Sequence, residues 1–269
     1  MPETTGINDQ NYLLTRQYNN ATNLNARIQL HARFSTNKYD WQRWVFDHFH
    51  IRPESRILEL GCGPGFLWRN NQDRLPSNWE ITLSDFSAGM LQEAQNNLSE
   101  SSHAFIFRVI DAQRIPFEDQ SFDAVIANHM LYHIPDREKA LSEIQRILKP
   151  GGLFYAATGG QAHLQEINAL LQKISGSELW GRNNDHAFGL ENGAAELSRW
   201  FTKVELTRLD GELVVTEAEP LLAYIFSGRA RYHLSEQQQQ MLRQIVEQTL
   251  QAQKAVRITT SSGLFEATK

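Results

Sequence analysis

Short apolar segments recur along the middle of this chain at the length of a β-strand. Their hydrophobic residues are nearly continuous rather than alternating, which is typical of parallel strands that are covered on both faces. These runs occupy Arg56–Leu60, Glu80–Phe86, Ala104–Ile110, Phe122–Asn128 and Gly152–Thr158. Helical patterns separate several of them, so the sequence predicts βαβ units in a doubly wound α/β sheet.

The helix before the last of these strands has the clearest signals. In "DREKALSEIQRILKPGG", apolar residues keep the period of 3.6 expected of one helix face, at Ala140, Leu141, Ile144, Ile147 and Leu148. Asp136 stands at the position of an N-cap, and Pro150-Gly151-Gly152 ends the pattern. We therefore predict a helix that starts after Asp136.

The segments outside this region are less regular. Helical patterns occur at Leu24–Phe34, Trp41–Phe49, Ala162–Ile174, Gly193–Trp200 and from Ser235, where Ser235 and Gln238 have capping-box spacing. A strand is predicted at Lys203–Leu209, and the closing "VRITTSSGLFEATK" is interpreted as two short strands around a Ser-Ser-Gly turn. We expect a helical cap over residues 1–50, a ligand-binding core over 51–160, and the rest of the sheet with lid insertions over 161–269, all in one compact domain. Plain surface decoration is the alternative for the lid.

Composition excludes several classes of partner. The chain has 269 residues, of which 41% are hydrophobic, and 26 Lys and Arg stand against 31 Asp and Glu. The net charge of −5 argues against nucleic acid or an anionic membrane as the main partner. The start, "MPETTGINDQ", lacks the apolar core of a signal peptide, no stretch approaches the length of a membrane span, and a single cysteine forms no internal disulfide. A cytoplasmic protein is expected.

Three glycines alternate with other residues directly after the first strand. The stretch "RILELGCGPGFL" places Gly61, Gly63 and Gly65 where a ligand binds in an open α/β sheet, outside the carboxyl ends of the strands. Glycine permits a tight turn there and close approach of a ligand to the backbone. The dinucleotide-binding fingerprint G-x-G-x-x-G is not met, because Phe66 occupies the position of its third glycine. A P-loop is also excluded, because no Gly-Lys-Ser/Thr follows.

Three carboxylates end consecutive strands beside these glycines. Asp85 can accept the hydroxyls of a ribose or cap a helix. Asp111, followed by Ala112, can hold an adenine amino group or form an ordinary turn. Glu59 repels a pyrophosphate but suits a ligand that carries an ammonium group; its alternative is a salt bridge inside the loop junction. This set favours S-adenosyl-L-methionine over a nicotinamide dinucleotide.

Four stretches together resemble a known family. "ILELGCGPG", "LSDFSAGML", "IDAQRIPFEDQSFDAVIANHMLYHI" and "EIQRILKPGG" are similar, in order and spacing, to motifs of class I S-adenosylmethionine-dependent methyltransferases. The similarity covers about Arg56 to Thr158 and points to the type 11 group, which includes ubiquinone/menaquinone-biosynthesis enzymes. It implies a Rossmann-like, mostly parallel seven-stranded sheet with helical lid segments, and S-adenosyl-L-methionine as the cofactor.

The resemblance also implies roles for individual residues. Glu59, Gly61, Gly63 and Gly65 would surround the methionine part of the cofactor. Asp85 would hold the ribose, with Phe86 and Met90 near the adenine, and Asp111 and Ala112 would bind the adenine edge. Asn128 and His129 would lie under the sulfonium side.

Methyl transfer requires mainly alignment and the exclusion of water, with a general base only for a protonated nucleophile. His129 and Tyr132 are the candidate catalytic residues, whereas His133 is interpreted as a packing or capping histidine and Cys62 as a small loop residue. No metal site is expected.

The lid segments are rich in aromatic residues, which fits a small, partly apolar substrate. The candidate pocket residues are His31, Phe34, Trp180 and Tyr224, with a lid core or a solvated helix face as the alternative. Arg182, Arg229 and Arg231 are candidates to hold a substrate carboxylate, unless they are plain surface arginines.

Three functions fit these features. The first is methyl transfer to an O, N or C atom of a small metabolite. The second is use of the same cofactor for cyclisation or elimination without methyl transfer, and the third is non-catalytic binding of S-adenosyl-L-methionine.

Overall fold

The computed structural model describes residues 9–176 and 187–269 of the chain. Within these residues, seven strands form one sheet in the order β3-β2-β1-β4-β5-β7-β6. The strands are β1 (Arg56–Leu60), β2 (Glu80–Asp85), β3 (Phe105–Val109), β4 (Phe122–Asn128), β5 (Leu148–Gly159), β6 (Thr202–Val215) and β7 (Val256–Thr268). β1 to β5 are parallel, and β7 runs antiparallel between β5 and β6. The predicted doubly wound, mostly parallel sheet is therefore confirmed.

The strand predictions hold in the core and fail at the C-terminus. β1 and β4 have the predicted bounds. β2 ends one residue earlier than predicted, and β3 is one residue shorter than predicted at each end. The interpretation of the last segment as two strands around a turn is wrong, because β7 is continuous. Ser262 and Gly263 pair with β5 on one side and with β6 on the other, so the backbone stays extended where a turn was expected. A Cβ on Gly263 would lie 2.8 Å from the Thr207 oxygen, so close strand packing explains this glycine.

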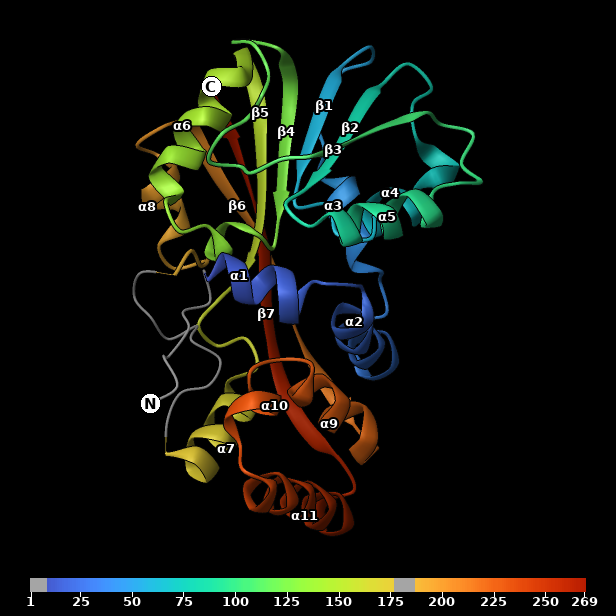
Figure 1. Cartoon of the computed structure of the whole chain (residues 1–269), viewed down its shortest axis with the longest axis vertical. Coiled ribbons are helices and arrows are strands. Elements are labelled where there is room, and N and C mark those ends of the chain that lie inside the picture. Colours follow the sequence, from blue (N-terminus) through green and yellow to red (C-terminus); the bar gives the residue numbers. More distant parts are fainter. Residues whose placement is uncertain (1–8, 177–186) are drawn as a thin grey trace.

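Helices cover both faces of the parallel part of the sheet (Figure 1). One core contains β1 and β4 residues together with Ala140, Leu141, Ile144 and Ile147 of α6. The core on the other face contains Trp44 of α3, Leu67 and Trp68 of α4, and Leu91 of α5. The helices are α3 (Trp41–Asp47), α4 (Phe66–Arg69), α5 (Ala88–Asn97), α6 (Arg137–Ile147) and α8 (Gly193–Leu197), with the short 3-10 turns η2 (Gln72–Arg74) and η3 (Leu131–His133).

The signals at the start of α6 are confirmed. The Asp136 side chain accepts a hydrogen bond from the Lys139 backbone N–H at 3.0 Å. The helix ends at Ile147, and Leu148 already begins β5. The stop signal is thus part of the strand that follows, where Gly151 has a φ of +74°.

A second group of helices surrounds the far ends of β6 and β7, below the main sheet in Figure 1. We call this group the helical lobe: α2 (Thr22–Phe34), α7 (Gln165–Ser175), α9 (Ala218–Phe226), α10 (Ala230–His233) and α11 (Glu236–Gln253). It has a core of its own, in which Leu30, Leu171, Leu222 and Leu242 meet Ile258 of β7. The predicted capping box is confirmed, since Ser235 and Gln238 each accept a hydrogen bond from the other's backbone N–H, at 3.3 and 2.9 Å.

The remaining N-terminal elements are α1 (Gln10–Tyr12) and the π-helical turn η1 (Leu13–Gln17), which cross between the sheet and the helical lobe (Figure 1). Among the described residues, no helix is both long enough and apolar enough to cross a membrane.

Candidate functional site

The glycine loop follows β1 at the point where the strand order reverses, because β2 lies on one side of β1 and β4 on the other. Gly61, Gly63 and Gly65 have φ angles of +69°, +53° and +74°, a region that favours glycine. A Cβ on Gly61 would lie 2.9 Å from Cβ of Met130, and one on Gly65 would lie 3.0 Å from Leu98. These two glycines are therefore required by packing against the loop after β4 and against the end of α5.

Glu59 is a buried carboxylate with an unusual environment. Its side chain is 2% exposed, and Oε2 accepts a hydrogen bond from Trp68 Nε1 at 2.6 Å. Burial, with a smaller contribution from the nearby charge of Asp85, raises the pKa of Glu59 to about 8. No ion pair joins Glu59 to any residue in the described part of the chain, so the alternative of a salt bridge in the loop junction is not what the structure shows.

Asp85 ends β2 and holds the glycine loop. Its Oδ2 accepts from the Gly63 N–H at 2.9 Å, and Oδ1 accepts from the Ser87 N–H at 2.8 Å. Burial raises the pKa of Asp85 in spite of these hydrogen bonds. The N-cap of α5 is Ser87 rather than Asp85, because the Ser87 hydroxyl accepts from the Met90 N–H at 3.3 Å. Phe86 lies between Asp85 and Ser87 in the sequence, and the Met90 side chain is buried.

Asp111 forms a turn after β3. Its Oδ1 accepts from the backbone N–H of Gln113 at 2.9 Å and from the Gln113 side chain at 3.0 Å. Ala112 beside it is buried. The turn arrangement considered for Asp111 is thus present, and its second carboxylate oxygen is 3.1 Å from the same Gln113 amide. The predicted adenine contact of Asp111 and Ala112 stays a prediction.

Asn128 ends β4 with a buried side-chain amide. Neither Oδ1 nor Nδ2 has a hydrogen-bond partner among the described residues. Buried amides are normally paired, because leaving both groups unpaired costs about 1–3 kcal/mol or more. The orphaned amide at the strand end therefore fits contact with a polar ligand.

His129 follows in a backbone conformation that is uncommon for a residue with a side chain, with φ of +53°. Its N–H donates to the Ala157 oxygen at 2.9 Å. Its ring lies 5.2 Å from the ring of Trp41, between centroids. Strained residues of this kind cluster at functional sites, which agrees with the position of His129 beside the glycine loop.

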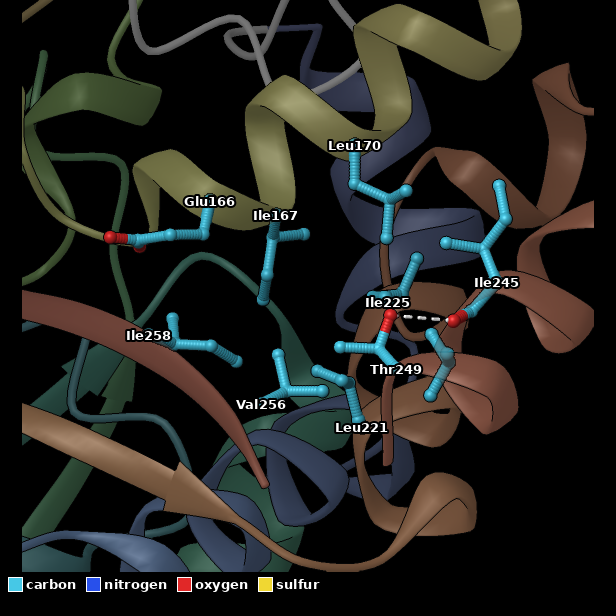
Figure 2. Close-up of a pocket in the computed structure, with 10 residues that line it drawn as sticks. Glu166, Ile167, Leu170, Leu221, Ile225, Ile245, Thr249, Val256 and Ile258 are labelled. Atoms are coloured by element: carbon cyan, nitrogen blue, oxygen red, sulfur yellow. Dashed lines mark hydrogen bonds between the residues drawn. The ribbon is translucent and has the colours of Figure 1, made fainter. Parts of the chain in front are cut away.

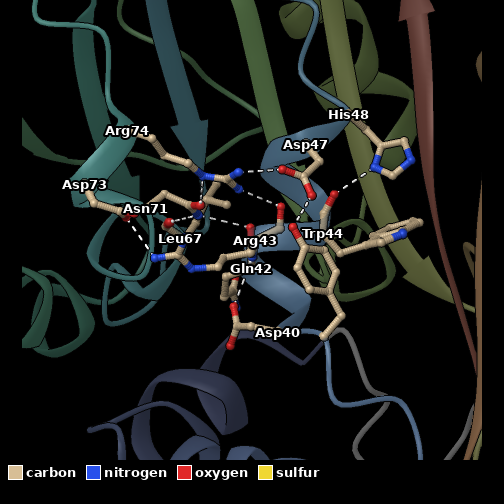
Figure 3. Close-up of polar contacts among 11 residues, drawn as sticks. Asp40, Gln42, Arg43, Trp44, Asp47, His48, Leu67, Asn71, Asp73 and Arg74 are labelled. Atoms are coloured by element: carbon tan, nitrogen blue, oxygen red, sulfur yellow. Dashed lines mark hydrogen bonds and ion pairs between the residues drawn. The ribbon is translucent and has the colours of Figure 1, made fainter.

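A polar network fastens α3, and with it Trp41, to the segment behind the glycine loop (Figure 3). Arg74 Nη1 contacts Asp47 at 2.6 Å, and Arg43 Nη2 contacts Asp73 at 2.9 Å. The buried Asn71 amide donates to the backbone oxygens of Gln42 and Leu67, at 3.1 and 2.7 Å. Because the segment after α4 is tied to α3 by these contacts, the position of Trp41 against His129 is fixed by the fold.

The N-terminal strap, which we define as Tyr18–Leu24, lies across the carboxyl ends of β2 and β4. The Ser87 hydroxyl donates to the Tyr18 backbone oxygen at 2.9 Å, and the Tyr18 hydroxyl shares a hydrogen bond of 3.0 Å with His133 Nε2. Leu24 lies near Gly63, because a Cβ added to Gly63 would be 3.6 Å from Cδ2 of Leu24. Tyr18 is not predictable from the sequence, because an isolated tyrosine ahead of the first predicted helix carries no signal.

His133 therefore does more than pack within its own segment. Its ring is the partner of the strap, and the ring of Tyr132 lies 4.5 Å away in a T-shaped arrangement. The Tyr132 hydroxyl also contributes to the electrostatic environment of Arg27 on α2. The structure thus brings Tyr132, His133 and Tyr18 together and places His129 against Trp41. The catalytic roles of His129 and Tyr132 stay predictions.

The predicted pocket residues that the structure describes lie in the helical lobe. Phe34 and Tyr224 are buried in its core, as the alternative of a lid core expects. His31 stacks on His163 with 5.9 Å between ring centroids and lies 6.2 Å from the ring of Tyr224. Trp180 falls outside the described residues. The substrate contacts of all four residues stay predictions.

An apolar cavity of about 100 Å³ lies inside the helical lobe, between α7, α9, α11 and β7 (Figure 2). Ile167, Leu221, Ile245 and Ile258 line it, and Glu166 is the one carboxylate at its wall. Glu166 is already committed, because its oxygens accept from the hydroxyl and the N–H of Thr259 at 2.6 and 2.9 Å. This cavity is a gap in lobe packing and is separate from the strand ends.

The strand ends fit one kind of ligand. The raised pKa values of the buried Glu59 and the partly buried Asp85 favour a cationic ligand, because a bound positive charge would offset the cost of ionising these carboxyl groups. The orphaned amide of Asn128 supplies both a donor and an acceptor. No group of three or more His, Cys, Asp or Glu side chains in the described parts of the chain is arranged to hold a metal ion.

Comparison with known proteins adds a family. The sequence profile described as "Methyltransferase domain", of type 11, matches residues 58–156. The ubiquinone/menaquinone biosynthesis C-methyltransferase UbiE of Bordetella avium is 31% identical over 112 residues. That match covers 42% of this chain and 44% of the relative, so the chain spans less than half the length of that relative.

Solved structures share the fold over more of the chain. The YcgJ protein from Bacillus subtilis has a TM-score of 0.60 at 17% identity, covering 85% of this chain and 97% of that one. Phosphoethanolamine N-methyltransferase 2 from Haemonchus contortus, in complex with phosphomonomethylethanolamine and S-adenosylhomocysteine, has a TM-score of 0.61 at 21% identity. It covers all of this chain and 61% of that one.

Proposed function

Because residues 58–156 form a class I S-adenosylmethionine-dependent methyltransferase domain of the type 11 group, we propose that this chain transfers the methyl group of S-adenosyl-L-methionine to a small molecule. The observation that supports the proposal is that polar side chains at the ends of β1, β2 and β4 lack the charged or hydrogen-bonding partner that each would need. Glu59 is a buried carboxylate and Asp85 a partly buried one, neither has a cationic partner among the described residues, and Asn128 has an orphaned amide.

These residues fit the cofactor group by group. Its ammonium group supplies the positive charge that Glu59 lacks, and its ribose hydroxyls can donate to Asp85. Gly63 is available for close backbone approach, because a Cβ there would meet no atom closer than 3.6 Å. Asn128, Asp111 and Ala112 remain for the rest of the molecule. Bound S-adenosyl-L-methionine supplies an activated methyl group, so the chemistry of the leaving group belongs to the cofactor.

The protein supplies position and exclusion of water. The strap closes the strand ends from the N-terminal side through Tyr18, Ser87 and His133. Alignment of a nucleophile in such a closed site contributes several kcal/mol without a base. Where the acceptor arrives protonated, the hydrogen-bonded pair of Tyr18 and His133 is the group that can take up its proton.

Labelled cofactor tests the proposal. Incubation of the protein with methyl-labelled S-adenosyl-L-methionine and a metabolite extract, read by mass spectrometry, should yield a labelled small molecule together with S-adenosylhomocysteine. The Asp85→Ala variant should lose the product, because it lacks both the ribose acceptor and the anchor of the glycine loop. Methylthioadenosine without a methylated product, or binding without turnover, would contradict methyl transfer.

A further inference from the structure

Arg229, directly before α10, has an unsatisfied guanidinium group. Its Nη2 atom is buried and has no hydrogen-bond partner in the described part of the chain. The guanidinium lies over the ring of Tyr12, whose centroid is 5.6 Å from the guanidinium carbon. Burial lowers the pKa of Arg229, although the group stays charged at neutral pH.

Other arginines of the chain show what is missing at Arg229. Arg27, which is close by, donates to the hydroxyl and the backbone oxygen of Ser227 at 3.0 and 3.3 Å. Arg137 is largely buried and pairs with Glu196 through both nitrogens. A guanidinium has five donors, and leaving one buried and unpaired costs stability. A partner from outside the described chain would remove this cost.

The surroundings of Arg229 are positive and aromatic. Tyr12 and Tyr232 meet edge to face with 6.3 Å between centroids, and Arg16 lies over the Tyr232 ring at 5.4 Å. Burial raises the pKa of the Tyr12 hydroxyl, and the positive charges of Arg229 and Arg27 oppose that rise. Asp9 is the carboxylate that acts on Arg229, but one of its oxygens accepts from the Tyr12 N–H at 3.0 Å and caps α1. Tyr232 is 47% exposed, so this cluster begins at the surface.

The cluster leads to the proposed methyl-transfer site. Tyr12 precedes the π-helical turn η1, and Tyr18 directly follows it. Tyr18 in turn hydrogen-bonds His133 beside the strand ends. Single π-helical turns occur frequently at functional sites, because they shift side chains away from the regular helical positions. Arg229 thus lies at the outer end of a chain of tyrosines whose inner end borders the methyl-transfer site.

We infer that Arg229 and Tyr12 bind an anionic group, a carboxylate or a phosphate, of the methyl acceptor. The planar guanidinium matches two oxygens of either group. The Tyr12 hydroxyl lies 3.3 Å from the Gln17 side-chain amide, and it can donate to a further oxygen of the ligand when that amide turns its nitrogen toward the hydroxyl. The inference rests on the proposed function, which it deepens by naming the class of substrate. The acceptor is then an anionic small molecule whose charged end is held away from the reacting atom.

Anion titration tests this inference without methyl transfer. Inorganic phosphate and acetate are each titrated calorimetrically into the full chain saturated with S-adenosylhomocysteine, with chloride at equal ionic strength as the reference. Wild type should show saturable binding in the millimolar range for at least one anion. Arg229→Gln should weaken it by about tenfold or more, whereas the control Arg208→Gln, which replaces an exposed arginine of β6, should stay within about twofold.

If Arg229 had only a structural role, its replacement would lower the thermal midpoint of unfolding. The inference predicts the opposite. Because Arg229→Gln removes a buried, unpaired charge, its thermal midpoint without anion should equal or exceed that of wild type. Arg229→Lys, which keeps the charge but not the two-pronged geometry, should retain part of the binding and serves if the glutamine variant does not fold. Binding of phosphate alone, of acetate alone or of both supports the inference and identifies the anion.

Absence of saturable binding to wild type would overturn the inference, as would equal binding by Arg229→Gln. The S-adenosylhomocysteine titration on the same samples separates the two proposals. Lost cofactor-product binding contradicts the proposed function, whereas intact product binding without anion binding contradicts only the role of Arg229.

Discussion

At the scale of residues, the site depends on charges that the folded chain leaves uncompensated. Glu59 is buried with Trp68 as its hydrogen-bond partner, and its pKa rises to about 8. A carboxyl group with a raised pKa makes the folded state bind its proton more tightly than the unfolded state does. Stability is therefore expected to fall as the pH rises from about 4.5 to about 8, unless a cationic ligand offsets the charge.

The Glu59→Gln variant should separate stability from binding. Without ligand, its free energy of unfolding should exceed that of wild type by on the order of 3 kcal/mol at pH 8, and the two should converge near pH 4.5. Urea unfolding at both pH values measures this difference, with the exposed Glu100→Gln as the control. A variant that is less stable than wild type at pH 8 would show that Glu59 is ionised and satisfied in the free protein.

His129 tests how much chemistry a side chain supplies. Its ring packs against Trp41 and its backbone is anchored to Ala157, so His129→Ala should leave S-adenosylhomocysteine affinity intact and lower the rate modestly. The rate is measured with the acceptor found by labelling, with exposed His50→Ala as the control. A loss of about a hundredfold or more, with loss of an ionisation near neutrality from the pH–rate profile, would instead make His129 a general base.

At the scale of elements, the sequence predicts what local pattern controls. β1 and β4 could be bounded to the residue because fully buried parallel strands are continuous apolar runs between polar ends. The continuous β7 could not, because Ser262 and Gly263 have turn-like local preferences that pairing on both sides overrides. The glycine loop and its carboxylates were likewise predictable from spacing, whereas the strap and the place of Arg229 depend on contacts between segments far apart in the chain.

Gly263→Ala tests the continuity of β7. The added Cβ would lie 2.8 Å from the Thr207 oxygen and 3.0 Å from Leu190 and Leu206, so β6 and β7 would have to separate. We expect a loss of about 1–3 kcal/mol in the free energy of unfolding. Ser262→Ala, at the neighbouring residue of the same strand, should cost less than about 1 kcal/mol. Equal small effects of the two variants would argue for a flexible turn here.

In the whole molecule, the sheet and the helical lobe have hydrophobic cores of their own. The sheet carries the carboxylates at its strand ends, whereas Arg27 lies on α2 of the helical lobe and Arg229 directly precedes α10. The strap joins the sheet and the lobe through Tyr18, whose neighbour Asn19 places its oxygen 2.4 Å from where a Cβ on Gly89 would lie. Movement of the lobe and the strap would therefore open or close the site without disturbing the sheet.

Hydrogen exchange tests this closure. Amides of residues 9–34 and 217–250 should gain protection when S-adenosylhomocysteine is bound, because closure removes water from the site. Amides of β5 and β7 should change little, since they are paired in the sheet with or without ligand. Identical exchange of the lobe and the strap in both states would remove the support for a substrate pocket between them.

We propose that the buried carboxylate of Glu59 holds the amino-acid part of S-adenosyl-L-methionine at the strand ends. Calorimetry at pH 7 with S-adenosylhomocysteine, methylthioadenosine and NADH tests it most directly. The first should bind in the micromolar range, about −8 kcal/mol, and release close to one proton as Glu59 ionises, which buffers of different ionisation enthalpy reveal. Methylthioadenosine, which lacks the ammonium group, should bind more weakly and release no proton, and NADH should not bind. Equal affinity for the two adenosyl compounds, or tight binding of NADH, would contradict the account.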